Sequence, residues 1–91
     1  MLYQQRAQWP HTVADIIKSL EGVWGVVGAT TTNGNLWRIE RSLKEPTVYT
    51  ITEYRGNDET DILSKLEFEA AKRDEAVKIF AEALGLAFTV S

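Results

Sequence analysis

The dipeptide Asn33-Gly34 constrains the fold of this chain more than any other local feature, because alternating apolar and polar residues flank it. Asn-Gly is the strongest short-range signal for a two-residue type I′ hairpin, in which both central residues take positive φ. A two-residue turn fixes the register of the strands that it joins, and the register decides which side chains share a face. The sequence therefore predicts an antiparallel pair of strands joined at residues 33 and 34.

Apolar residues at helical spacing predict two amphipathic helices, over residues 12–21 and 73–84. Thr12 and Asp15 have the three-residue spacing of a capping box at the start of the first helix. Gly22 follows that helix directly, where a glycine commonly ends a helix. Each helix carries one apolar stripe and therefore one face to bury.

Alternating or β-branched residues predict four strands, over residues 23–32, 36–43, 47–54 and 62–69. Because each helix has a single apolar stripe, we expect both to cover the same side of the sheet. The expected fold is a single α+β domain over residues 1–91: a four-stranded antiparallel β-meander with two helices on one face, in the order α-β-β-β-β-α. A short extended N-terminal arm precedes the first helix.

The predicted turn sorts the strand residues into two faces. With Asn33 and Gly34 as the loop, Trp37 lies opposite Thr30 and Leu43 lies opposite Trp24, and opposed residues share a face. A three-residue loop at residues 44–46 and pairing of the last two strands complete the assignment. The expected inward face consists of ten mostly aromatic or branched residues: Trp24, Val26, Trp37, Ile39, Leu43, Tyr49, Ile51, Ile62, Leu66 and Phe68.

One row of the outward face, next to the hairpin, is apolar although we expect this face to meet water. A tyrosine flanked by leucines, with arginines at the rim, has the composition of a protein-binding surface. The row and its rim are the candidate protein-binding site: Leu36, Arg38, Tyr54, Arg55 and Leu63. Two structural alternatives remain open: the row stabilises the sheet by cross-strand packing, or the N-terminal arm with Tyr3 and Trp9 covers it.

Composition argues against a general nucleic-acid or membrane-surface binder. The net charge is −3 with a pI near 5.1, and the ten basic residues are scattered along the chain. No apolar stretch approaches membrane-spanning length, and there is no cysteine. We therefore expect a cytoplasmic protein. Binding of single-stranded nucleic acid through Tyr54 and the arginines stays as an alternative.

The sequence contains no catalytic, cofactor or metal motif, so the expected protein is not an enzyme. His11 is the single histidine and has no matched nucleophile. Residues 57–61 contain enough oxygen ligands to attract a divalent cation, but they lack the spacing and central glycine of an EF-hand loop. A solvated acidic turn is the favoured interpretation, and cation binding remains open.

The predicted first strand, from Val23 to Thr32, lies at a sheet edge and carries no charge. Natural edges are usually protected by Lys, Pro or a bulge, so the sequence leaves a homodimer through this edge open. The element order, small size and mild acidity resemble those of small phage-encoded proteins that bind and block host machinery. The expected function is a small protein-binding module, an inhibitor of a host protein; a homodimeric accessory subunit is the alternative.

Overall fold

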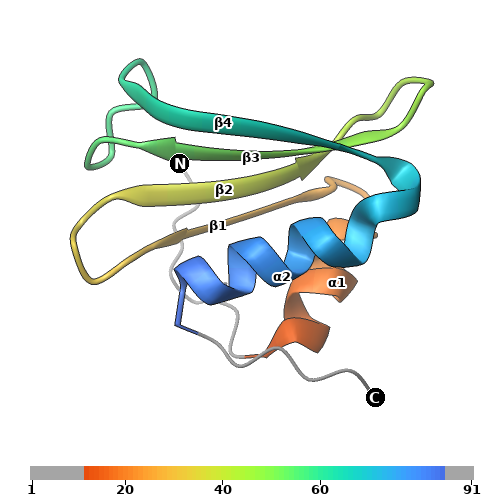
Figure 1. Cartoon of the computed structure of the whole chain (residues 1–91), viewed down its shortest axis with the longest axis horizontal. Helices are drawn as coiled ribbons and strands as arrows, with labels where there is room; N and C mark the ends of the chain where they lie inside the picture. Colours follow the sequence, from red (N-terminus) through yellow and green to blue (C-terminus); the bar gives the residue numbers. More distant parts are fainter. Residues whose placement is uncertain (1–11, 86–91) are drawn as a thin grey trace.

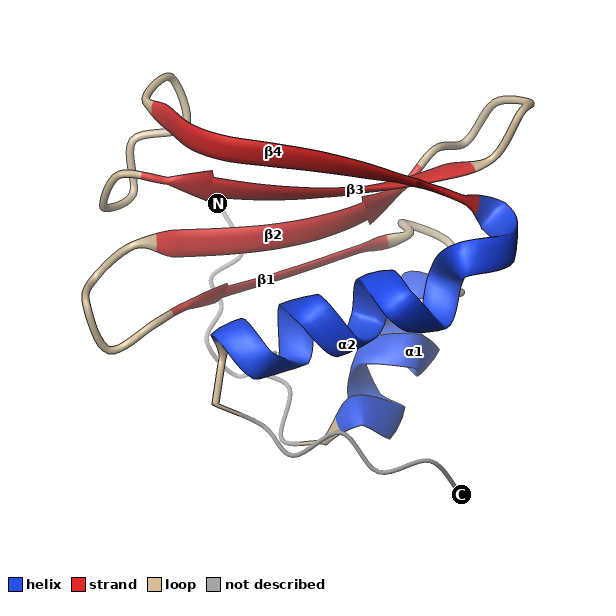
Figure 2. Ribbon diagram, in the orientation of Figure 1, coloured by secondary structure: helices blue, strands red, loops and turns tan. Residues whose placement is uncertain are grey.

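The computed structural model describes residues 12–85 and has the predicted element order. Its elements in chain order are α1 (Val13–Leu20), β1 (Val26–Thr30), β2 (Leu36–Arg41), β3 (Val48–Tyr54), β4 (Ile62–Glu69), the 3-10 turn η3 (Ala70–Lys72) and α2 (Arg73–Ala83). The strands form one antiparallel sheet in the order β1-β2-β3-β4, with both helices on the same face (Figures 1 and 2). The predicted α+β fold is confirmed, whereas the N-terminal arm and His11 lie outside the described residues.

The first helix begins at the predicted capping box. The Thr12 hydroxyl accepts a hydrogen bond from the Asp15 N–H at 3.1 Å, and the Asp15 carboxylate accepts one from the Thr12 N–H at 3.2 Å. These bonds satisfy backbone donors that the first turn of a helix leaves unpaired. The chain therefore enters α1 at a defined residue.

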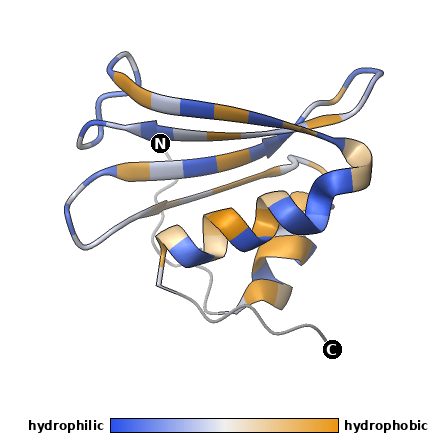
Figure 3. Ribbon diagram, viewed as in Figure 1, coloured by the Kyte–Doolittle hydropathy of each residue, from blue (hydrophilic) through white to orange (hydrophobic). Residues whose placement is uncertain are grey.

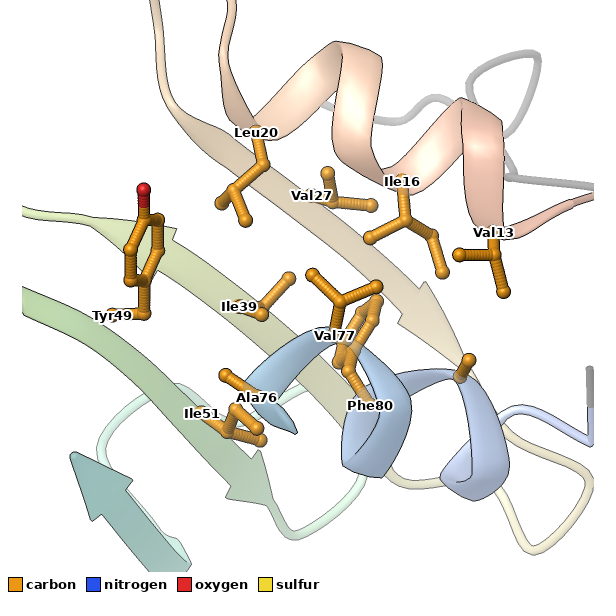
Figure 4. Close-up of a cluster of buried hydrophobic side chains, with 11 residues drawn as sticks. Val13, Ile16, Leu20, Val27, Ile39, Tyr49, Ile51, Ala76, Val77 and Phe80 are labelled. Carbon is orange, nitrogen blue, oxygen red and sulfur yellow. The ribbon is translucent and has the colours of Figure 1, made fainter. Parts of the chain in front are cut away.

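Both helices bury their apolar stripes against the inward face of the sheet. Figure 4 shows Ile16 and Leu20 of α1 and Val77 and Phe80 of α2 converging on Ile39 of β2, and all five side chains are fully buried. Hydropathy alternates along the strands, most clearly in the second half of β4 (Figure 3). The core therefore lies between one sheet face and two helices.

The hairpin between β1 and β2 differs from the prediction, and the difference has a local cause. Gly34 donates its N–H to the Thr31 carbonyl at 2.9 Å, and Thr31 donates its own to the Asn35 carbonyl at 2.9 Å. Gly34 has φ +89°, whereas Asn33 is not in the positive-φ region. The loop is therefore a type I turn over residues 31–34, and its last residue, Gly34, forms a G1 bulge. It is not a type I′ turn.

The Asn33 side chain supports this turn. Its Oδ1 accepts hydrogen bonds from the Asn35 N–H, at 3.1 Å, and from the Thr31 hydroxyl. An asparagine that bonds the backbone two residues on stabilises a turn without itself taking positive φ. A third loop residue shifts β1 by one position, so that Val27 opposes Ile39 and Ala29 opposes Trp37.

The shifted register corrects the predicted faces of β1. A one-residue slip moves every side chain of a strand to the other face. Val27 and Ala29 point inward and are buried, whereas the prediction had Val26 there. The observed register places Val27, where the prediction had Gly28, against Ile39, which fills the core with side-chain volume.

The pairing of β2 with β3 and of β3 with β4 follows the prediction through most of its length. Ile39 opposes Ile51, and Ile51 opposes Leu66. A bulge next to Tyr54 then makes Ile62, in place of Leu63, its partner. Of the predicted inward residues, Trp37, Ile39, Tyr49, Ile51 and Phe68 contact the core. Three others are exposed, contrary to the prediction: Trp24, Leu43 and Ile62. Leu66 has its predicted place opposite Ile51 but is 46% exposed, because the helices do not cover it.

Candidate functional site

The predicted binding row assembles on the sheet face opposite the helices, but its centre is buried. Leu36 and Tyr54 are directly opposed across β2 and β3, as expected. Only 9% of Leu36 and 5% of Tyr54 is exposed, so these two residues do not meet water as predicted. Whether the N-terminal arm covers them concerns residues outside the described range.

Arg38 joins this row to the loop that follows β3. Its guanidinium lies 4.9 Å from the centroid of the Tyr54 ring and donates to the Tyr54 hydroxyl. It also donates to the Glu59 carboxylate at 2.9 Å, and Glu40 lies 3.9 Å away. Burial lowers the pKa of Arg38, but the Glu59 hydrogen bond and the charge of Glu40 outweigh it and raise the pKa overall. The positive charge of Arg38 is therefore balanced within the chain.

The remaining predicted site residues lie at the margin of the row. Arg55 is exposed and pairs with Asp61 at 2.9 Å, and Leu63 is partly exposed beside the β4 bulge. The structure thus brings Leu36, Arg38 and Tyr54 together as a packed cluster. As a protein-binding surface, this set stays a prediction.

The acidic loop at residues 57–61 uses its carboxylates for its own structure. The Asp58 carboxylate accepts from the Thr60 N–H at 3.0 Å and from the Thr60 hydroxyl at 2.6 Å. The hydroxyl and backbone bonds lower the pKa of Asp58. Glu59 binds Arg38 and Asp61 binds Arg55. Within residues 12–85, no three metal-ligating side chains form a group that could hold a metal ion.

Three exposed apolar residues lie at the end of the sheet where β1 begins and β2 ends. They are the most exposed large apolar residues of the described chain: Val23 at 85%, Trp24 at 82% and Leu43 at 73%. The Arg41 N–H donates to the Gly25 carbonyl at 2.7 Å, which fixes the segment after α1 next to the end of β2. We call Val23, Trp24 and Leu43 the Trp24 tip.

Backbone and side-chain contacts of Arg41 hold the Trp24 tip in place. The Arg41 guanidinium donates to the Gly22 carbonyl at 2.8 Å, so it spans the loop that carries Val23 and Trp24. Gly25 has φ +63°, and a Cβ there would lie 3.0 Å from the Arg41 Nε. Only glycine combines this backbone conformation with such a close approach. The loop is therefore built around Arg41.

The structure beneath the Trp24 tip is tied together by polar contacts. The Tyr49 hydroxyl donates to the Glu21 carboxylate at 3.2 Å, and Arg73 of α2 donates to the same oxygen at 3.4 Å. Burial raises the pKa of Tyr49, and the negative charge and hydrogen bond of Glu21 add to the effect. These contacts join the end of α1 to β3 and α2, which gives the tip a fixed base.

The β2–β3 loop that carries Leu43 is also ordered by local bonds. The Ser42 N–H donates to the Val48 carbonyl at 2.8 Å, which closes a loop over residues 43–47. The Ser42 hydroxyl donates to the Lys44 carbonyl at 2.9 Å and accepts from the Lys44 N–H at 3.1 Å. Leu43 therefore sits in a tight turn and projects from it, two residues after β2 ends.

The sequence interpretation missed the Trp24 tip because it placed Trp24 and Leu43 inward as an opposed pair. A signal was available: Val23 and Trp24 stand between Gly22 and Gly25, directly after a helix end. Two glycines that bracket two residues indicate a loop more than a strand. That loop removes both large side chains from the sheet pattern.

Comparison of the chain with protein-family models, curated proteins and solved structures finds no match. Among residues 12–85, neither helix is long and apolar enough to cross a membrane.

Proposed function

We propose that this chain is a small, non-enzymatic protein-binding module of the cytoplasm, and that the Trp24 tip is its contact surface. The observation that carries the proposal is the exposure of Val23 and Trp24 on a loop held by Arg41, with Leu43 also exposed on the loop after β2. Tryptophan is among the residues most enriched at the energetic centres of protein interfaces. A large apolar group that the fold does not bury is available to a partner.

The tip has the energetic properties that a contact surface needs. Burial of an aromatic side chain removes about 150–250 Å² from water, worth about 4–6 kcal/mol at about 25 cal/mol per Å² before the costs of association. Those costs fall when the binding segment is already ordered. The hydrogen bonds from Arg41 to Gly22 and Gly25 provide that order.

The expected partner is a protein with an apolar pocket that accepts an indole ring. The role that we propose is inhibition: a compact domain that places Trp24 in such a pocket would block whatever the pocket normally receives. The size and mild acidity of the chain are typical of small proteins that act in this way.

Site-specific photo-cross-linking in the native host tests the proposal. A photoreactive amino acid in place of Leu43 lies at the end of the sheet where β2 ends and β1 begins, and the same amino acid in place of Lys78 on the exposed side of α2 is the control. We expect a discrete protein adduct from position 43 and none from position 78. The added change Trp24→Ser should abolish the adduct because it removes the anchor.

The same experiment distinguishes the outward-face site from the Trp24 tip. A photoreactive group at Leu63 reports on the site of Leu36, Arg38, Tyr54, Arg55 and Leu63. Adducts from position 63 that persist in Trp24→Ser would contradict the tip and favour the outward face.

Nucleic-acid binding is the second candidate, because an exposed indole can stack on an unpaired base. The affinity of such a complex falls steeply with salt, whereas an apolar protein contact responds little. A salt titration of binding to a single-stranded oligonucleotide therefore separates the two functions.

A further inference from the structure

The outer edge of β4 is a long strand edge that no described strand pairs with. β4 is the last strand of the sheet and has eight residues, against five in β1. Seven of its eight residues are exposed, and Phe68 alone is half-buried. Unpaired edges of this kind are templates for pairing with another strand.

The inward face of β4 extends the apolar surface beyond the area that the helices cover. Leu66 lies opposite Ile51 and Phe68 lies opposite Tyr49, so both belong to the inward face. Phe68 packs against the core, whereas Leu66 is 46% exposed. A neighbour at this edge would shield Leu66 from water.

The outward face of β4 carries charges without partners. Lys65 lies opposite Thr52 and Glu67 lies opposite Thr50. Within residues 12–85, neither Lys65 nor Glu67 forms an ion pair. Two opposite charges, spaced two residues apart on one face, flank Leu66.

We propose that β4 pairs with β4 of a second copy of this chain, antiparallel and with Leu66 opposite its own copy. In this register Lys65 lies opposite Glu67 of the second copy, and the same pair recurs on the other side of the two-fold axis. Opposite charges at directly opposed positions stabilise a sheet, and apolar pairs do so as well. The interface is therefore complementary to itself, as a two-fold dimer requires.

The charges of β4 differ between the neighbouring registers. Side chains alternate between the two faces of a strand. In a sheet that continues across the two-fold axis, the pairing register of the two β4 strands can therefore change only in steps that keep the inward faces of both copies on the same side. The adjacent register in one direction places Lys65 against Lys65. The adjacent register in the other places Glu67 against Glu67, but it also sets Lys65 opposite Glu69 of the second copy. Like charges directly opposite are destabilising. The charges of β4 thus disfavour the register that opposes Lys65 to Lys65, and the charge-reversal variants below test which of the other two forms.

The first strand offers no comparable specificity. β1 carries no charged residue to fix a register, so the homodimer that the sequence leaves open through residues 23–32 rests on an uncharged edge alone. Pairing through β4 also leaves Val23 and Trp24 free, because they precede β1 at the opposite edge of the sheet (Figure 1). A dimer would present two tips, and bivalency raises the apparent affinity for a partner with two sites.

Charge reversal and its rescue test the proposal. The wild-type protein, Lys65→Glu, Glu67→Lys and the double variant are compared by sedimentation equilibrium between about 1 μM and about 1 mM. Each single change creates two like-charge pairs, so we expect the dissociation constant to rise at least about tenfold. The double variant restores both pairs and should return to within about threefold of wild type.

Lys78→Glu is the matched control, because it makes the same charge change on an exposed position of α2. Circular dichroism verifies that all variants are folded. A wild-type mass of one chain at the highest concentration would overturn the proposal, as would a dimer that the β4 variants leave unchanged, which would indicate the β1 edge. Failure of the double variant to recover, or equal weakening by Lys78→Glu, would also overturn it. None of these outcomes depends on the Trp24 tip, which is tested separately by cross-linking.

Discussion

Thr32→Pro tests the hairpin that orients β1, because the observed and predicted turns give this substitution opposite signs. In the observed turn Thr32 is the second residue of a type I turn, it is exposed, and its N–H donates no hydrogen bond to another backbone group. Proline is favoured at that position because its fixed φ matches the turn. In a two-residue type I′ hairpin, Thr32 would instead be the last strand residue, paired with Asn35.

The expected effect of Thr32→Pro is a stabilisation of about 0.4–1 kcal/mol, through loss of conformational freedom in the unfolded chain. For a domain of this size that gain raises the melting temperature by about 2–8 °C. Urea denaturation followed by circular dichroism measures it. A type I′ turn would lose a strand hydrogen bond and be destabilised by more than the gain.

Gly34→Ala is the companion change. Gly34 has φ +89°, and nothing lies within 4 Å of where a Cβ would be, so the cost is backbone strain alone, about 1–2 kcal/mol.

Destabilisation by Thr32→Pro of more than about 1 kcal/mol would refute the three-residue loop and the orientation of β1 derived from it.

Three further predictions concern the buried side chains. Phe80→Ala should cost about 3–5 kcal/mol in urea denaturation because Phe80 is fully buried between α2 and the sheet; a loss below about 1 kcal/mol would contradict that packing. Tyr54→Ala should cost about 3–5 kcal/mol, whereas Leu63→Ala should cost clearly less, and equal losses would show that Tyr54 is not packed beneath Arg38. Tyr49 has a pKa raised above 10.0 by burial and by Glu21, so above about pH 10 the unfolded state releases this proton first and stability falls as pH rises. Tyr49→Phe should flatten that alkaline fall in the free energy of unfolding, and an unchanged slope would argue against the contact with Glu21.

The two helices could be predicted from the sequence because their signals are local patterns. The stripe that includes Val77 and Phe80 specified which face of α2 is buried, and Thr12 with Asp15 specified where α1 begins. Each signal depends on residues within one or two turns of helix. Such local patterns survive folding because tertiary contacts reinforce them.

The register of β1 could not be predicted, because Asn33-Gly34 is compatible with two turns that differ by one residue. The choice depends on where the Asn33 side chain bonds and on whether Val27 or Gly28 faces Ile39. The first is a local contact and the second is a tertiary one, and the dipeptide alone specifies neither. The same error placed Trp24 in the core, so the site predicted from the sequence did not include Trp24.

The burial of Tyr54 could not be predicted from the sequence either. Tyr54 contacts Arg38, which the prediction assigned to the rim of the binding site, and Arg38 in turn binds Glu59, which the prediction treated only as part of an acidic loop. Charged residues 21 positions apart, such as Arg38 and Glu59, leave no periodic signal. Networks of this kind become visible only when the sheet is assembled.

Solvent quenching of Trp24 fluorescence tests most directly the claim that this indole stands in water, on a tip available to a partner. Two variants suffice: Trp9→Phe with Trp37→Phe, which retains Trp24, and Trp9→Phe with Trp24→Phe, which retains Trp37. With acrylamide as quencher, we expect Trp24 to be quenched nearly as strongly as free tryptophan amide, and Trp37, which packs against the core, much less. Quenching of Trp24 that is no stronger than that of Trp37 would contradict the exposed tip and the function proposed for it.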